Sequence, residues 1–118
     1  MEQPFSLTSE VKDNRLIIAT SGYINNVGGE AIAGAFRRHF DGGIREVVLN
    51  LADSRVVNSV GMSFLIEIIE QLEDSQGKLV FTNLDPSVEK MLAIMGLFKY
   101  ALKENTVDDA LRALAKTP

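Results

Sequence analysis

The chain lacks cysteine and tryptophan, and it contains one histidine, His39, and three prolines. Without cysteine it forms no disulfide, no thiolate zinc site and no thiol nucleophile, and a single histidine does not make a histidine-rich metal cluster. We therefore expect neither a metal nor a cofactor. Long apolar runs are missing too, since none approaches the roughly 18 residues of a membrane span.

Length and charge narrow the class of protein further. A chain of 118 residues buries a core without cross-links but is short for two ordinary domains, so we predict one domain over residues 1–118. The formal net charge is −4, a sign that disfavours nucleic acid or an anionic membrane surface as the main partner. The first residues lack a basic stretch followed by an apolar one, and we expect a cytoplasmic protein.

The spacing of apolar residues predicts an α/β fold. A hairpin with the polar turn Lys12-Asp13-Asn14 opens the chain, and residues 47–51 form an apolar run typical of a strand covered on both faces. Because single helices separate the later strands, we expect a mixed, mostly parallel sheet with an N-terminal hairpin and about four helices. The predicted helices cover residues 26–40, 59–74, 86–95 and 107–114, and the later strands cover residues 78–82 and 97–101.

The predicted helix over residues 59–74 has an apolar side and a polar side. Ser59 is expected to cap it by accepting from the backbone N–H of Gly61 or Met62. Val60 falls on the polar side, and Phe64 and Ile68 make the apolar side unusually wide. Such residues form a partner surface or are covered by other elements, and the pattern leaves both interpretations open. The polar side itself comprises Ser63, Glu67, Glu70, Gln71 and Asp74.

Two features of the same helix are also found in catalytic sites. The stretch Val57-Asn58-Ser59-Val60-Gly61 matches half of the G-x-S-x-G nucleophile elbow, with valine in place of the first glycine. His39 is predicted to be a cation at a helix C-terminus, so a serine hydrolase using Ser59 is kept only as a remote alternative. The carboxylates of the polar side are expected to form a solvated face rather than an acid–base or metal site. We therefore expect no enzymatic activity.

Four stretches, taken in order, resemble the STAS domain, the module of anti-sigma factor antagonists and of the cytoplasmic tails of sulfate transporters. Gly22-Tyr23-Ile24-Asn25 corresponds to the family's Gly-Glu-Leu-Asp, and Val47-Val48-Leu49-Asn50-Leu51 to its central strand. Asn58-Ser59-Val60-Gly61-Met62 corresponds to its Asp-Ser-Ser/Thr-Gly-Leu signature, and the segment from Asn83-Leu84 through Val88 to Gly96-Leu97 to its late strand and helix. The resemblance covers residues 5–114 and implies the STAS fold.

The resemblance also implies a function. In that family the serine or threonine before the signature glycine is phosphorylated by an anti-sigma factor that is also a kinase, and the added charge expels the kinase. Val60 occupies this position here and has no hydroxyl, although Ser59 and Ser63 lie near it in the sequence. Asn25 and Asn58 stand where the family has aspartates. The resemblance therefore implies the binding surface without the phosphorylation switch.

The leading hypothesis is a non-enzymatic binding protein whose partner is an anti-sigma factor or a serine kinase of that type. Its predicted partner-binding residues are Asn25, Asn58, Ser59, Val60, Gly61, Met62, Ser63, Phe64 and Ile68. The alternative is a scaffold that assembles with other STAS proteins or serves as a small subunit beside a transporter ATPase. The sequence leaves a homodimer and the identity of the partner open.

Overall fold

The structure, a computed structural model, describes residues 4–116 and alternates strands with helices. A short 3₁₀ helix, η1, precedes the last strand. In chain order the elements are β1 (Ser6–Lys12), β2 (Arg15–Ser21), α1 (Asn26–Asp41), β3 (Glu46–Asp53), α2 (Ser59–Asp74), β4 (Lys78–Thr82), α3 (Pro86–Ile94), η1 (Leu97–Lys99), β5 (Leu102–Glu104) and α4 (Val107–Ala115). This confirms the predicted α/β class, the N-terminal hairpin and the four helices.

The five strands form one mixed sheet in the order β1-β2-β3-β4-β5. β1 pairs antiparallel with β2, and the remaining neighbours are parallel. Asp13 and Asn14 connect the hairpin with positive φ angles of 54° and 64°, a conformation that short polar residues tolerate in tight turns. Each parallel pair is joined through a helical crossover, so the carboxyl ends of β2, β3 and β4 lie at the same edge of the sheet.

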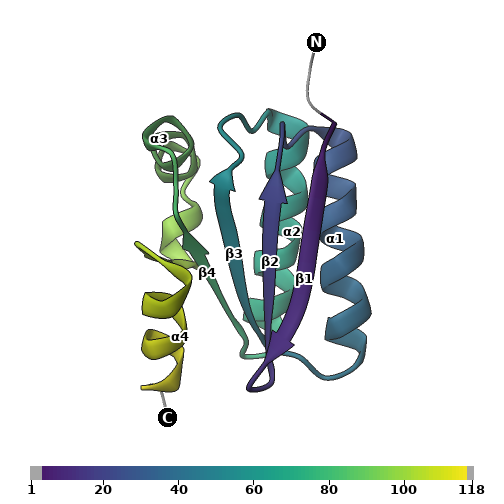
Figure 1. The fold of residues 1–118 in the computed structure, drawn as a ribbon, viewed down its shortest axis with the longest axis vertical. Coiled ribbons are helices and arrows are strands. Elements are labelled where there is room, and N and C mark those ends of the chain that lie inside the picture. The colour runs from purple at the N-terminus through teal and green to yellow at the C-terminus, as the bar shows by residue number, and fades with distance from the viewer. Residues whose placement is uncertain (1–3, 117–118) are drawn as a thin grey trace.

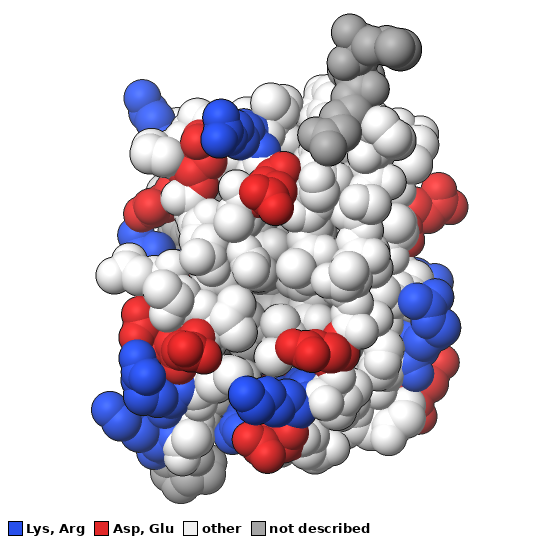
Figure 2. All heavy atoms as spheres, in the orientation of Figure 1, with Lys and Arg blue, Asp and Glu red and all other residues white. Residues whose placement is uncertain are grey.

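Helices cover the two faces of this sheet unequally. α1 and α2 lie side by side on one face, α4 covers part of the other, and α3 lies near the carboxyl ends of the parallel strands (Figure 1). The central strand β3 is buried on both faces: Leu49 belongs to the core under α1 and α2, and Val48 to the smaller core under α4. On the side that carries α4, charged side chains lie mostly around the margin, and the middle of the exposed surface has few of them (Figure 2).

The packing of α1 beside α2 explains the wide apolar side of α2. Ile68 is 2% exposed and belongs to the main core, together with Ile32 and Phe36 of α1. Phe64 is half-buried, and its ring fills the space that a Cβ at Gly29 of α1 would need. Phe64 is therefore covered by the neighbouring helix and Ile68 is buried in the core, which is one of the two interpretations that the sequence left open.

One predicted element is wrong. Residues 97–101 form no strand; Leu97–Lys99 is η1, and the edge strand is Leu102–Glu104. Gly96 has a φ of 81° and turns the chain, after which Leu97 and Ala101, four residues apart, both point into the core. In a strand, residues 97, 99 and 101 would share one face, but Lys99 is exposed while Leu97 and Ala101 are buried, as a helical turn requires.

The predicted starts of α3 and α4 are confirmed. Asp85 caps α3, and Pro86 is its first residue, the position where the missing N–H of proline costs nothing. Thr106 caps α4 by accepting from the backbone N–H of Asp109 at 3.1 Å. Within residues 4–116, no helix combines the length and the apolar character needed to cross a bilayer.

Candidate functional site

The loops that lead into α1 and α2 are bonded to each other at the carboxyl edge of the sheet. The backbone N–H of Gly22 donates to the carbonyl of Asp53 at 3.0 Å, and that of Ile24 donates to the carbonyl of Val56 at 3.0 Å. The N–H of Asn58 returns a bond to the carbonyl of Ile24 at 3.1 Å. These bonds hold the N-termini of two parallel helices next to each other.

Both helices are capped by an asparagine side chain. Asn25 Oδ1 accepts from the backbone N–H groups of Val27 at 3.0 Å and Gly28 at 3.2 Å. Asn58 Oδ1 accepts from the N–H of Gly61 at 2.8 Å. The amide oxygens therefore satisfy backbone donors that the first turn of a helix leaves unpaired, and they do so without adding charge.

The prediction that Ser59 caps α2 is wrong by one residue. Ser59 is the first residue inside the helix and is exposed, and the cap is Asn58. Asn58 is the cap because its carbonyl accepts the first helical bond, from the N–H of Met62 at 2.8 Å, while its own backbone is still extended. Serine and asparagine are both good caps, so the residue types alone did not decide between them.

The two helix starts repeat one pattern, Asn-x-Val-Gly, at residues 25–28 and 58–61. In each, the asparagine is the cap and the valine is the second helical residue. Val27 is 61% exposed and Val60 is 47% exposed, while Val56, in the loop bonded to Ile24, is 53% exposed. We call Asn25, Val27, Val56, Asn58 and Val60 the paired-cap surface. Val27 and Val56 were not among the predicted partner-binding residues, although the repeated four-residue pattern contains Val27.

The glycine of each pattern is required by the loop that passes over it. A Cβ at Gly28 would lie 2.9 Å from the carbonyl oxygen of Tyr23, and a Cβ at Gly61 would overlap the carbonyl oxygen of Ile24. Real Cβ atoms do not approach backbone oxygens this closely. Glycine therefore permits the close approach that places the two caps side by side.

The predicted partner-binding residues separate into surface and core. Asn25 and Asn58 are half-buried, and Ser59, Val60 and Ser63 are exposed. The Ser63 hydroxyl donates to the carbonyl of Val60 at 2.6 Å, within the first turns of α2. By contrast, Gly61, Met62 and Ile68 are buried, and Phe64 is half-buried against α1. The side chains of Met62 and Ile68 belong to the core and are not available as anchors for a partner.

Two helix dipoles contribute positive potential behind the paired-cap surface. Neither α1 nor α2 has an acidic residue in its first turn, so the positive ends of two parallel helix dipoles lie behind exposed valines and neutral amides. α3 begins close by, because the Ser87 hydroxyl lies 2.5 Å from Asp85 Oδ2 and 3.5 Å from the carbonyl oxygen of Arg55. That hydroxyl, the Ser87 N–H and the Arg55 charge hold the pKa of Asp85 below its usual value, so Asp85 caps α3 as a carboxylate.

The structure does not bring the residues of the hydrolase alternative together. Ser59 begins α2, whereas His39 lies in the last turn of α1, where its Nδ1 is 2.9 Å from the carbonyl oxygen of Ala35. Because the two helices start side by side, the length of α1 puts these side chains roughly 20 Å apart along its axis. Across residues 4–116, no group of three or more histidine, aspartate or glutamate side chains has the arrangement of a metal site.

Comparison with known proteins places the chain in a known domain family. The STAS domain family matches residues 6–110, which include all five strands and both caps of the paired-cap surface. The chain belongs to the STAS domain family, as the resemblance predicted.

Individual proteins that this chain resembles are named as anti-sigma factor antagonists. A protein of Bordetella bronchiseptica named "Putative anti-sigma factor antagonist BtrV" is 29% identical over 107 residues, which cover 91% of this chain and 92% of that protein. An anti-sigma factor antagonist from Mycobacterium paratuberculosis has a similar crystal structure, with a TM-score of 0.85, 24% identity and coverage of 98% and 100% of the two chains. The Bacillus cell fate determinant SpoIIAA in its phosphorylated form matches with a TM-score of 0.73, 20% identity and coverage of 94% and 99%.

Proposed function

We propose that this chain is a non-enzymatic regulatory protein that binds an anti-sigma factor, or a serine kinase of that type, through the paired-cap surface. We further propose that the binding is not switched off by phosphorylation. The observation that carries the proposal is Val60: it is 47% exposed at the second position of α2 and bears no hydroxyl. The names of the BtrV and Mycobacterium relatives support the kind of partner.

The position of Val60 supports the missing switch. In the family that the sequence resembles, the residue before the signature glycine accepts the phosphate, and Val60 directly precedes Gly61. The name of the SpoIIAA structure records a phosphorylated form of a protein with this fold. Valine accepts no phosphate, so in our proposal the surface stays apolar whether or not the kinase has ATP.

The neighbouring residues fit a constitutive apolar contact. Val27, Val56 and Val60 are three exposed aliphatic side chains within two adjoining segments, and burying them against a partner removes apolar area from water. Asn25 and Asn58 are neutral where the family has aspartates, so the surface also lacks the carboxylates that flank the acceptor in its relatives. A partner would therefore meet a surface with little charge of its own.

The test is to measure binding to a purified anti-sigma factor kinase from the same organism, before and after incubation with ATP. We expect the chain to bind equally in both conditions and mass spectrometry to find no phosphate on Ser59 or Ser63. Val60→Ser is the matched variant: it should accept phosphate and bind at least about tenfold more weakly after ATP, because phosphate brings nearly two negative charges to the contact.

Two results would count against the proposal. If neither the chain nor Val60→Ser binds the kinase, the proposed partner is wrong. Stoichiometric phosphate on Ser59 or Ser63, together with loss of binding, would show that the switch has moved to a neighbouring hydroxyl instead of being lost.

A further inference from the structure

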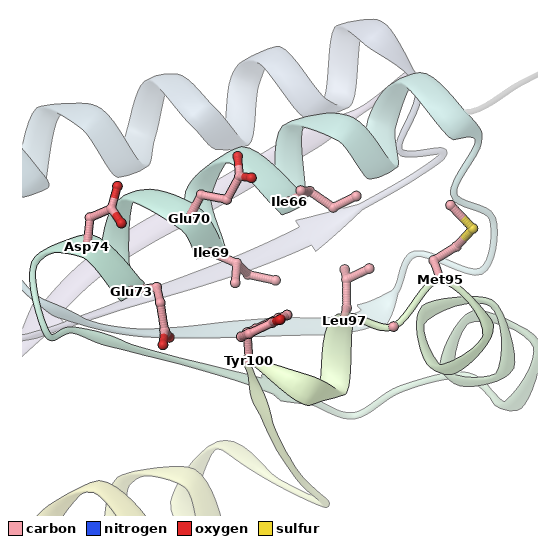
Figure 3. A pocket seen from close by; sticks show the side chains of 9 residues that line it. Ile66, Ile69, Glu70, Glu73, Asp74, Met95, Leu97 and Tyr100 are labelled. Atoms are coloured by element: carbon pink, nitrogen blue, oxygen red, sulfur yellow. The ribbon is translucent and has the colours of Figure 1, made fainter.

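A second exposed feature lies on the other half of α2. A groove of about 570 Å³ runs between the C-terminal half of α2 and the segment that joins α3 to η1 and β5. Its apolar lining comes from both sides, and its acidic lining comes from α2 alone (Figure 3). The apolar residues are Ile66, Ile69, Met95, Leu97 and Tyr100, and the acidic residues are Glu70, Glu73 and Asp74.

The floor of the groove is built into the core, whereas its apolar rim is exposed. Ile69 and Leu97, which form the floor, are 5% and 3% exposed. Met95 and Tyr100, which form the rim, are 54% and 64% exposed. Figure 3 shows Ile66 and Ile69 on the side of α2 that faces Leu97 and Tyr100. Flexible methionine and amphipathic tyrosine side chains are common at protein interfaces, so the rim has the character of a contact surface.

The acidic wall has an unbalanced charge. Among residues 4–116 no ion pair involves Glu70, Glu73 or Asp74, and the last turn of α2 contains no basic residue. The negative end of the α2 dipole lies at the same place. Glu70 is three residues from Glu73 and four from Asp74, so like charges repel one another along the helix. These acids do not help α2 to fold, and they complement a positive charge that the described part of the chain does not supply.

We propose that this groove binds an amphipathic helical segment of a partner protein, with apolar residues facing the floor and lysine or arginine residues facing the acidic wall. The dimensions suit this occupant, because residues 66–74 of α2 extend about 12 Å, or roughly two helical turns. An amphipathic helix presents its anchors at i, i+3, i+4 and i+7 over that length. The groove adds a contact separate from the paired-cap surface, and its occupant does not depend on what Val60 binds.

The test uses a designed helical peptide of about 15 residues, with leucines at i, i+3, i+4 and i+7 and arginines beside them. A second peptide carries glutamates in place of the arginines. We expect the arginine peptide to shift the NMR methyl signals of Ile66, Ile69 and Met95 in the full chain. It should bind at least about tenfold more tightly than the glutamate peptide, and the preference should shrink as salt is added.

Two pairs of substitutions with the same change in net charge locate the effect. Glu70→Gln with Glu73→Gln should weaken binding of the arginine peptide about tenfold or more. Glu10→Gln with Glu30→Gln, at exposed positions on β1 and α1, should leave it unchanged. All four side chains are exposed, so we expect both variants to keep the fold. An unchanged amide spectrum would verify this. Equal weakening by the two pairs would reduce the effect to net charge and overturn the proposal.

Further outcomes separate this groove from other occupants. If the peptides bind equally, if the shifted signals surround Val60 instead, or if neither peptide binds, the proposal is wrong. A concentration-dependent dimer that Tyr100→Glu abolishes would assign the groove to a second copy of the chain and overturn it as well. Binding of the arginine peptide that survives Val60→Asp supports the groove even if the proposed function fails.

Discussion

The two ends of α2 show how differently one helix is used. At its start the helix is capped by the neutral Asn58, exposes Val60 and has no acidic residue in the first turn. At its end it exposes Glu70, Glu73 and Asp74 beside an apolar groove and has no basic residue in the last turn. Between them runs one continuous buried side, comprising Met62, Leu65, Ile69 and Leu72. Folding constrains that buried side and leaves the exposed side available for the two contacts proposed above.

The largest effect is expected from Gly61→Ala at the start of α2. The new Cβ would overlap the carbonyl oxygen of Ile24, so the bonded loops would separate, at a cost of about 3 kcal/mol in the free energy of unfolding. Gly34→Ala in α1 is the matched control, since the nearest atom to its Cβ would be in the exposed Arg38 guanidinium at 3.9 Å. It should stabilise the fold by about 0.5–1 kcal/mol.

Urea unfolding measures both glycine variants. If Gly61→Ala were as stable as the wild type, the close approach of the loop to the helix start would not hold the caps together. The start of α2 would then not depend on glycine at position 61.

A medium effect on binding is expected from Val60→Asp. The carboxylate would oppose an apolar contact and weaken binding of the proposed partner at least about tenfold, or about 1.4 kcal/mol. Folding should be unchanged or slightly favoured, by less than about 1 kcal/mol, because an acid in the first turn suits the helix dipole. Val60→Asn has the same shape without the charge and should weaken binding less. Calorimetric titration separates the two variants, and equal affinity for wild type and Val60→Asp would place the contact elsewhere.

The smallest effect is expected at the other end of α2, from Glu73→Lys. A cation there meets the negative end of the helix dipole and relieves repulsion from Glu70, so the fold should gain about 0.5 kcal/mol. Glu30→Lys, in the second turn of α1, makes the same charge change and should bring no gain. Thermal unfolding at low salt measures both. A loss of stability for Glu73→Lys would mean that the acids at this end already have a structural role, which would weaken the contrast between the two ends.

Much of the architecture was predictable because it depends on local patterns. The predicted bounds of α2, residues 59–74, and of β4, residues 78–82, agree with the structure. Asp85-Pro86 and Thr106 mark the starts of α3 and α4 in the sequence itself, since capping is decided by residues within one turn. The exposure of Val60 was also visible, because its angular position on the helix follows from the period of the helix alone.

The errors and omissions arise where a distant segment decides the outcome. Ile68 was predicted to contact a partner, but it is buried in the main core. Residues 97–101 were predicted to form a strand, but Gly96 turns the chain before them. Val27 joins the paired-cap surface through the backbone bonds between residues 22–24 and 53–58, and those bonds are not visible in a local pattern.

The amino-acid sequence by itself determined the alternation of strands and helices, the capped helix starts and the absence of a hydroxyl at position 60. Those properties depend on residue chemistry and on spacings of a few residues. Only the tertiary structure decided which apolar side chains on α2 remain exposed, that two Asn-x-Val-Gly starts form one surface, and that the acids of α2 border an apolar groove. These outcomes require segments more than twenty residues apart to pack together, and a local sequence pattern does not determine which distant segments do so.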